Sequence, residues 1–246
     1  MDFLFNHRSI RKYKSDEIPD DLLHKIIEAG TRASTTGNMQ LYSVVITRNT
    51  ENKARLAPLH FNQTPVIQAP VILTVCADMN RFNRWCECRG ADAGYDNLLW
   101  VINAITDAAL FAQNVCIAAE SQGLGICYLG TALYNAAEIV DVLKLPKGVI
   151  PVTVVTLGYP DEDPGLTDRL PVEAVVHYET YKDYSPERID ELFGEKEALS
   201  SSAKFVKENK KKNLAQVFTD IRYTREDSIH YSEKLLDTLR DQGFEV

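Results

Sequence analysis

The stretch NLLWVINAITDAALFAQNVCIAAESQ, residues 97–122, decides how this chain folds. It is apolar on nearly every side, so a soluble protein can hide it only at its centre or in a subunit interface. Its polar interruptions are Asn103, Asp107, Gln113 and Asn114. A membrane span would carry fewer of them, and Gly123 and Gly125 stop the segment. The stretch therefore predicts a long central helix and no membrane span.

Short apolar runs on both sides of this stretch predict strands. Residues 70–77 are apolar almost throughout, which is typical of a strand covered on both faces. Further strands are predicted at 42–47, 126–129 and 149–157, and helices at 22–33, begun by Pro19 and Asp20, and at 136–143. Because helices and strands alternate without a regular βαβ repeat, we expect an α+β fold with a central, mostly antiparallel sheet covered by helices.

The composition becomes polar and charged after Tyr178. Helices are predicted there at 186–193 and from about 214 to 241. A detached polar helix of that length has little reason to stay ordered alone, so it needs a surface to pack on. We expect a single domain in which residues 1–180 form the core and residues 181–246 form a helical extension, packed on the core and on a partner subunit.

The overall charge argues against polyanionic partners. The chain of 246 residues has 27 Lys and Arg against 35 Asp and Glu, a formal net charge of −8. Such a protein repels nucleic-acid phosphates and anionic membranes unless a local basic patch reverses the field. We therefore expect neither nucleic acid nor a membrane among its partners.

The five cysteines point to reduced thiols. Their number is odd, and the chain begins without the basic start and apolar run of a secretory signal, so we expect a cytoplasmic location. Cys86 and Cys88 lie one residue apart, which is not zinc-site spacing, and no second Cys/His pair follows. We expect them to be surface thiols and expect no metal site.

Three separated clusters carry the cations and hydroxyls that suit a phosphate. They are His-Arg-Ser-Ile-Arg at 7–11, Ser-Thr-Thr at 34–36, and Arg169 within Leu-Thr-Asp-Arg-Leu-Pro at 166–171. Arginine forks and hydroxyls are matched to dianionic oxygen. Each cluster alone has an ordinary alternative, a solvated turn, because exposed arginines rarely need a role.

Taken together and in order, these clusters resemble the FMN-binding signature of the nitroreductase family, in the branch of NADPH-dependent, oxygen-insensitive nitroreductases and flavin reductases. The resemblance covers nearly the whole chain. Its further landmarks are Gln40 closing the Ser/Thr loop, Gln63 before Pro65, the run Cys-Ala-Asp-Met-Asn-Arg at 76–81, and Ala-Ala-Glu-Ser-Gln-Gly-Leu-Gly at 118–125 leading to Tyr-Leu-Gly at 128–130.

The resemblance implies tightly but non-covalently bound FMN and assigns roles around it. His7, Arg8 and Ser9 would hold the phosphate and ribityl chain, with Arg169 joining from elsewhere in the fold. Arg11 would lie by the N1/C2 carbonyl region, where negative charge builds as the ring is reduced. Gln63 would hydrogen-bond the pyrimidine edge, and Pro65 is a further implied cofactor contact.

The same resemblance implies a homodimer whose cofactor sites are built across the interface. Ser34, Thr35 and Thr36 would line the cofactor from the partner subunit. Tyr128, Leu129 and Gly130 would pass the N5 edge, where a glycine lets the backbone come close. The alternative for Gly130 is a turn that ends a strand.

The sequence departs from the branch pattern in two places. Thr167 stands where relatives usually have a lysine, and Asp168 adds a negative charge beside the expected phosphate. Thr131 stands where relatives often have a second glycine, which would narrow the space next to the ring. The first departure bears on FMN affinity and the second on pocket shape.

The resemblance implies a ping-pong reaction in which NADPH or NADH reduces the flavin and a small-molecule acceptor then takes the same place. Nitroaromatics, quinones and free flavin are the expected acceptors, and the sequence does not name the physiological one. No nucleophile elbow, zinc motif, Walker motif or dinucleotide-binding glycine motif is present in the sequence. Two alternatives stay open: a slowly turning-over protein that stores or senses FMN, and a reductive dehalogenase-like member of the same fold.

One dense basic run stands out in this acidic chain. It comprises Lys204, Lys207, Lys210, Lys211 and Lys212. It falls where the resembling branch has a mobile loop that takes the NADPH 2′-phosphate, and lysine suits phosphate as a point charge. The alternative is a solvated loop without a ligand. Which of these two is correct decides whether the protein prefers NADPH or NADH as its electron donor.

Overall fold

The computed structural model describes residues 2–246 and divides the chain into two compact units. The first comprises Met1–Gly165 and Tyr231–Val246, and the second comprises Leu166–His230. The expected single domain, with an extension from residue 181 that packs on the core and on a partner subunit, stays a prediction.

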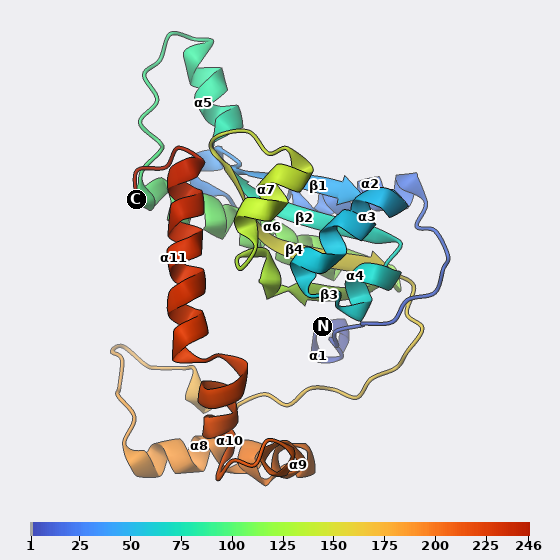
Figure 1. Ribbon diagram of the computed structural model, residues 1–246, viewed down its shortest axis with the longest axis vertical. Coiled ribbons are helices and arrows are strands. Elements are labelled where there is room, and N and C mark those ends of the chain that lie inside the picture. The colour runs from blue at the N-terminus through green and yellow to red at the C-terminus, as the bar shows by residue number, and fades with distance from the viewer. Residues whose placement is uncertain (1) are drawn as a thin grey trace. The chain divides into compact units, whose positions relative to one another are not determined.

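The first unit is built on one four-stranded antiparallel sheet (Figure 1). Its strands are β1 (Tyr42–Thr47), β2 (Val71–Asp78), β3 (Gly125–Leu129) and β4 (Val149–Gly158), in the spatial order β1-β2-β4-β3. A bulge lies where Cys76 pairs with Pro151, and proline has no N–H to give to a ladder. The antiparallel sheet and all four strands predicted from sequence are confirmed.

Both faces of the sheet are covered, which explains the continuous apolar run of β2. Val71, Leu73 and Val75 belong to a core shared with α2 (Asp20–Gly30) and α6 (Leu98–Ser121). Ile72 belongs to a second core shared with α3 (Thr50–Leu56), α4 (Thr64–Gln68) and α7 (Ala136–Leu143). Figure 1 shows α3, α4 and α7 on the near face. Alternate side chains of the strand therefore enter opposite cores.

The remaining elements of the first unit are short. They are α1 (Asp2–Phe5), α5 (Asn80–Glu87), and the 3₁₀ turns η1 (Thr36–Asn38), η2 (Ala57–His60) and η3 (Gly130–Ala132). Cys86 lies on the inner side of α5 and is buried, whereas Cys88 is exposed. The expectation of two surface thiols is therefore wrong for Cys86. Across residues 2–246, no group of three or more His, Cys, Asp or Glu is placed to hold a metal ion.

Helix α6 begins and ends where the sequence predicts, with Asn97 and Gln122 as its caps. By length and composition alone it would be able to cross a membrane. In this fold one side of it packs against α2 and the sheet, so that Asp107, near its middle, is only 1% exposed. A Cβ on Gly30 of α2 would meet Val115 Cγ2 at 2.4 Å, so the absence of a side chain there lets the two helices approach closely.

Another side of α6 is apolar and exposed. Leu99 and Ile102 are 63% and 52% exposed, and Leu110 lies two turns further along the same side. Exposed apolar residues gathered on one stripe are typical of an interaction surface. We call Leu98, Leu99, Ile102 and Leu110 the α6 stripe.

The second unit contains the turn η4 (Val172–Ala174) and the helices α8 (Pro186–Ala198), α9 (Ser200–Glu208), α10 (Leu214–Val217) and η5 (Phe218–Arg222). Helix α11 (Arg225–Asp241) begins in this unit and ends in the first. The helix predicted at 186–193 is five residues longer, and α9 covers Lys204 and Lys207. The expectation of a loop at 204–212 is therefore wrong for its first half.

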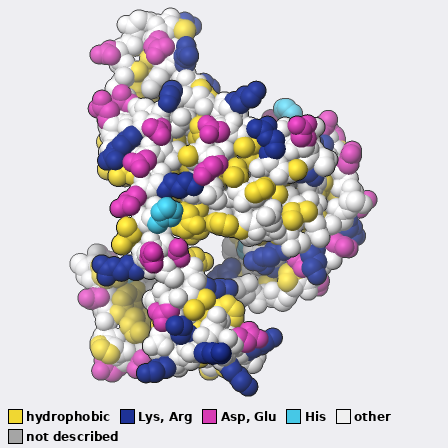
Figure 2. Space-filling model, in the orientation of Figure 1, with side chains coloured by type: hydrophobic (Ala, Val, Ile, Leu, Met, Phe, Trp, Pro, Cys, Tyr) yellow, Lys and Arg dark blue, Asp and Glu magenta, His cyan; other side chains and the backbone are white. Residues whose placement is uncertain are grey.

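The single helix predicted from 214 to 241 is also wrong, because α11 is a separate helix that begins at Arg225, directly after Thr224. The Thr224 hydroxyl accepts a hydrogen bond from the Asp227 amide at 3.1 Å and donates to the Asp227 carboxylate at 2.7 Å. The Thr224 hydroxyl thus caps the amide of the third helical residue, which favours a helix start over a continuing helix. Positive and negative side chains are interspersed over the face of the molecule shown in Figure 2.

Candidate functional site

The predicted phosphate segment, residues 7–11, is held against the edge of the sheet next to β3. The Ile10 amide donates to the Ile126 carbonyl at 2.8 Å, and the Tyr13 hydroxyl donates to the Ile10 carbonyl at 2.6 Å. A Cβ on Gly125 would lie 2.7 Å from Ile10 Cβ, so only glycine admits this approach. Burial raises the pKa of Tyr13, which keeps it a neutral donor. The backbone of the segment is therefore fixed by the core.

Carboxylates contact three parts of this segment. His7 Nδ1 lies 2.7 Å from Glu120 Oε1, at the end of α6, and Arg8 forms an ion pair with Asp163. Glu162 Oε1 accepts from the Arg11 amide at 2.5 Å and from the Lys12 amide at 3.1 Å. The acidic run at 161–163 could have indicated these contacts from the sequence, but it was not used to predict them.

The side chain of Arg11 differs from that of Arg8. It is exposed, and its guanidinium makes no hydrogen bond or ion pair with any residue from 2 to 246. The charge of Arg8 is already offset by Asp163. Among the two arginines of the segment, Arg11 is therefore the one with positive charge available to a ligand.

The other end of β3 carries the predicted ring contacts. Leu129 is buried, while Tyr128 is partly exposed and its hydroxyl donates to Gln113 Oε1 at 3.4 Å. A Cβ added to Gly130 would meet no atom within 4 Å, so its backbone faces open space. Gly130 lies four residues beyond Ile126, which corresponds to about 13 Å along a strand. The phosphate segment and the open backbone thus lie at opposite ends of β3.

A buried histidine, which sequence reasoning missed, links η2 to this open end. His60 is fully buried, and its Nδ1 lies 2.7 Å from Thr131 Oγ1. Burial lowers the pKa of His60 to about 4, so the ring is neutral. The Thr131 hydroxyl is thus held by a core residue, and sequence reasoning had no signal for this pair because the two residues are 71 positions apart.

The turn after His60 presents Gln63. Phe61 and Asn62 both have left-handed backbone conformations, with φ of 54° and 52°. Such strain in non-glycine residues is typical of functional sites. The half-buried Gln63 amide makes no side-chain hydrogen bond within the described part of the chain, whereas Pro65 is buried in the first turn of α4. The Gln63 side chain is therefore available to a ligand.

The Ser/Thr cluster is anchored elsewhere on α6. Asp107 accepts hydrogen bonds from the Thr36 amide at 2.8 Å, the Thr36 hydroxyl at 3.1 Å and the Leu41 amide at 3.2 Å. Ser34 is exposed and Thr35 is half-buried. Asp107, one of the few polar residues in this apolar helix, thus holds the loop that carries the Ser/Thr cluster.

The two anchors on α6 separate the clusters within one chain. Asp107 holds Thr36 and Glu120 holds His7, and the two carboxylates are thirteen positions apart (120 − 107). At 1.5 Å per residue, this corresponds to about 20 Å along the helix. Residues 7–11, Gln63 and 128–130 are gathered around β3, whereas the cluster at 34–36 is held at a different level of α6.

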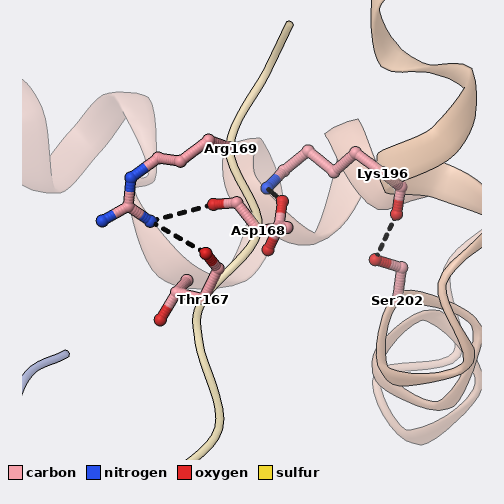
Figure 3. A network of polar contacts seen from close by, with 5 residues as sticks. All are labelled: Thr167, Asp168, Arg169, Lys196 and Ser202. Carbon is pink, nitrogen blue, oxygen red and sulfur yellow. Dashed lines mark hydrogen bonds and ion pairs between the residues drawn. The ribbon is translucent and has the colours of Figure 1, made fainter. Parts of the chain in front are cut away.

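Arg169 and the lysine run belong to the second unit. The exposed Arg169 guanidinium donates to the carbonyl oxygens of Thr167 at 3.3 Å and Asp168 at 2.9 Å (Figure 3). Within the lysine run, Lys211 forms an ion pair with Asp220 at 2.9 Å and Lys204 lies 3.7 Å from Glu208. Lys207 and Lys210 are exposed and have no ion pair with residues 2–246.

These features fit FMN in part. The uncompensated Arg11 guanidinium and the unused Gln63 amide offer a cation and a hydrogen-bonding amide, and no side chain covers the backbone at Gly130. Arg8 fits less simply, because Asp163 already occupies its guanidinium. The first unit alone therefore supplies the kinds of groups that a flavin requires.

The chain is similar to known proteins over most of its length. The model of the Nitroreductase family matches residues 4–159. The chain is 33% identical over 183 residues to the FMN reductase (NADPH) of Bacillus subtilis (strain 168), covering 74% of each chain. It is 34% identical over 182 residues to the oxygen-insensitive NADPH nitroreductase of Salmonella typhimurium (strain LT2), again covering 74% of each.

The fold is also found among solved structures. A protein from Bacteroides fragilis NCTC 9343 has a structure that superposes with a TM-score of 0.98. The two sequences are 52% identical, and the match covers 100% of each chain. The helical part after residue 165 therefore has a counterpart in that structure.

Proposed function

The chain belongs to the nitroreductase family, and on this premise we propose that it is an FMN-dependent oxidoreductase that transfers electrons from NAD(P)H to nitroaromatics, quinones or free flavin. The observation that carries the proposal is the arrangement around β3. A free cation lies in the segment beside the start of β3, and a free amide and open backbone lie in the turns near its end. The free thiols are consistent with the cytoplasmic location that we propose.

Bound FMN would supply the hydride and electron transfer, so the chain's own residues would only bind, orient and stabilise charge. His7, Arg8 and Ser9 would hold the phosphate and ribityl chain, and the family resemblance implies Arg169 as a further phosphate ligand. Arg11 stabilises the negative charge that develops near N1 and the C2 carbonyl. Gln63 would hydrogen-bond the pyrimidine edge, and the backbone from Tyr128 to Gly130 would pass the N5 edge. Donor and acceptor use the same open space in turn.

Turnover with an added quinone tests the proposed function. We expect the purified protein to be yellow, to release FMN on denaturation, and to oxidise NADPH steadily with equimolar reduction of the quinone. Anaerobic conditions exclude a background reaction with oxygen, and an equal concentration of free FMN is the control. A flavin-loaded protein that oxidises NADPH no faster than this control would instead be a storage or sensor protein.

We further propose a homodimer in which the α6 stripe meets its counterpart. Burying four large apolar side chains is favourable, and Gln113, which accepts from Tyr128, lies on the same side of α6 one turn beyond Leu110. The second subunit would then lie beside the open end of β3. Its Ser34, Thr35 and Thr36 would complete the site, as the spacing between the two α6 anchors supports.

Sedimentation of the flavin-loaded protein tests this assembly. We expect a dimer of twice 27.7 kDa with one FMN per chain. Ile102→Asp should shift the equilibrium toward monomer and release FMN in parallel, because a charge would be buried in the interface. His24→Asp, on the exposed side of α2, adds the same charge outside the stripe; it is the matched control and should leave the equilibrium unchanged. A flavin-loaded wild-type monomer would contradict the dimer.

Donor preference depends on the lysine run. We propose that Lys207 and Lys210 bind the NADPH 2′-phosphate, with Lys204 and Lys211 nearby but already paired with carboxylates. The double variant Lys207→Ala/Lys210→Ala should raise the KM for NADPH by about tenfold at low salt and leave that for NADH nearly unchanged. Salt should diminish the difference, because exposed charges are screened within about 10 Å at 0.1 M. Lys25→Ala, on the exposed side of α2, controls for net charge. An equal response of both donors would leave the run without this role.

A further inference from the structure

Asp168 places a negative charge next to the arginine that is proposed to bind the phosphate. Figure 3 shows that the Asp168 carboxylate forms an ion pair with Lys196, which belongs to α8. Lys196 Nζ lies 2.6 Å from Asp168 Oδ2, within hydrogen-bonding distance. The hydrogen bond from Lys196 holds the pKa of Asp168 below its ordinary value. The carboxylate is therefore ionised and paired.

The position of Lys196 is set by the turn between α8 and α9. The Ser202 hydroxyl, in a residue only 8% exposed, donates to the Lys196 carbonyl at 2.7 Å. The side chains of Lys196 and Asp168 are 30% and 31% exposed, so surrounding atoms shield the pair in part. A partly shielded pair with a fixed backbone is less screened than two mobile surface charges.

The pairing decides which charge the segment presents. Arg169 hydrogen-bonds only to uncharged carbonyl oxygens, and it forms no ion pair within residues 2–246. With Lys196 in place, three charged side chains sum to one positive charge, and it resides on Arg169. Without Lys196, the Asp168 carboxylate would stand unpaired beside that guanidinium and cancel its charge.

We propose that Lys196 is a positioning residue for the flavin phosphate, which neutralises Asp168 so that Arg169 remains cationic and free to bind it. The inference rests on the proposed function, because it requires a phosphate at Arg169. It assigns a purpose to a lysine that is 27 positions away from the arginine along the chain. It also explains how a phosphate can bind next to Asp168, whose negative charge would otherwise repel it.

A double-mutant cycle with two ligands tests the proposal. The variants are Lys196→Met, Asp168→Asn and their combination, all in the full chain, with Arg169→Ala for the phosphate contact and Lys25→Met for net charge. FMN release is followed by flavin fluorescence as loaded protein is diluted. Binding of riboflavin, which has the same ring without the phosphate, is measured by titration.

We expect Lys196→Met to weaken FMN binding by about three- to tenfold at low salt and to leave riboflavin binding unchanged. Adding Asp168→Asn should restore FMN affinity to within about twofold of wild type, because the uncompensated carboxylate is then gone. Lys25→Met should have no effect. Arg169→Ala should weaken FMN binding at least as much as Lys196→Met.

Three results would overturn the proposal. If the combined variant stays as weak as Lys196→Met, the lysine acts on the ligand directly and not through Asp168. If FMN and riboflavin weaken equally, the change is structural. If Lys196→Met leaves FMN affinity at the wild-type value while Arg169→Ala weakens it, the phosphate site stands and only the role of Lys196 is lost. Failure of Arg169→Ala itself would instead remove the phosphate contact from the proposed function.

Discussion

Asp107→Ala is expected to lower the free energy of unfolding by about 2–4 kcal/mol and to release the loop at 34–41. The carboxylate is buried in α6 and accepts three hydrogen bonds, two of them from backbone amides. Alanine leaves the Thr36 and Leu41 amides without a partner, and each unsatisfied buried donor costs about 1–3 kcal/mol. Urea denaturation measures the loss as a lower midpoint at an unchanged slope.

Two further variants make this result specific. Asp107→Asn keeps one acceptor oxygen for Thr36. It should therefore lower the free energy of unfolding by about half as much as Asp107→Ala does. Thr106→Ala changes the neighbouring exposed residue, whose hydroxyl bonds only to a carbonyl of its own helix, and should stay within about 0.5 kcal/mol of wild type. A loss below about 1 kcal/mol for Asp107→Ala would mean that water replaces the carboxylate. The loop would then not depend on this anchor.

Arg11→Ala is expected to slow the reduction of bound FMN by NADPH on the order of 10- to 100-fold while most FMN is retained. The guanidinium is exposed and unpaired, so its charge acts on the ligand and not on the fold. A positive charge near the site of developing negative charge stabilises the transition state. Losing a preorganised donor in a dry site costs about 100- to 1000-fold, and an exposed charge, which solvent screens, contributes less. Anaerobic stopped-flow absorbance of the flavin measures the rate.

The charge itself is tested by Arg11→Lys, which should recover much of the rate. The midpoint potential of the flavin should fall in Arg11→Ala and not in Arg8→Ala, because Asp163 already offsets the charge of Arg8. Arg8→Ala is instead expected to affect FMN retention. If Arg11→Ala releases FMN but reduces at the wild-type rate once saturated, Arg11 is a binding residue only.

Periodicity and turn residues sufficed to predict the framework. The limits of β1 and α7 agree with prediction, because β-branched or apolar runs there end at turn formers. The helix at 214–241 failed because its amphipathic period runs on through Thr224, and only the pairing of Thr224 with Asp227 marks the new start. The N-cap hydrogen bond at Thr224 therefore determines where the helix begins, although the amphipathic pattern continues through this residue.

The candidate site could be predicted in its residue types but not in its charges. The sequence shows Arg8 and Arg11 as equivalents in one motif, whereas the fold pairs one with Asp163 and leaves the other free. His60 and Lys196 were missed for the same reason. Their partners, Thr131 and Asp168, are distant in sequence, and composition carries no information on which charges meet.

The double anchoring of α6 has a consequence for changes in chain length. One residue inserted between Asp107 and Glu120 would rotate one anchor by about 100° relative to the other and move it by about 1.5 Å. Either the Thr36 loop or His7 would then lose its carboxylate. Residues 88–96, mostly exposed and carrying neither anchor, tolerate insertion far better. Gains and losses of residues among related proteins should therefore accumulate before the helix begins, while the number of turns between its two carboxylates stays constant.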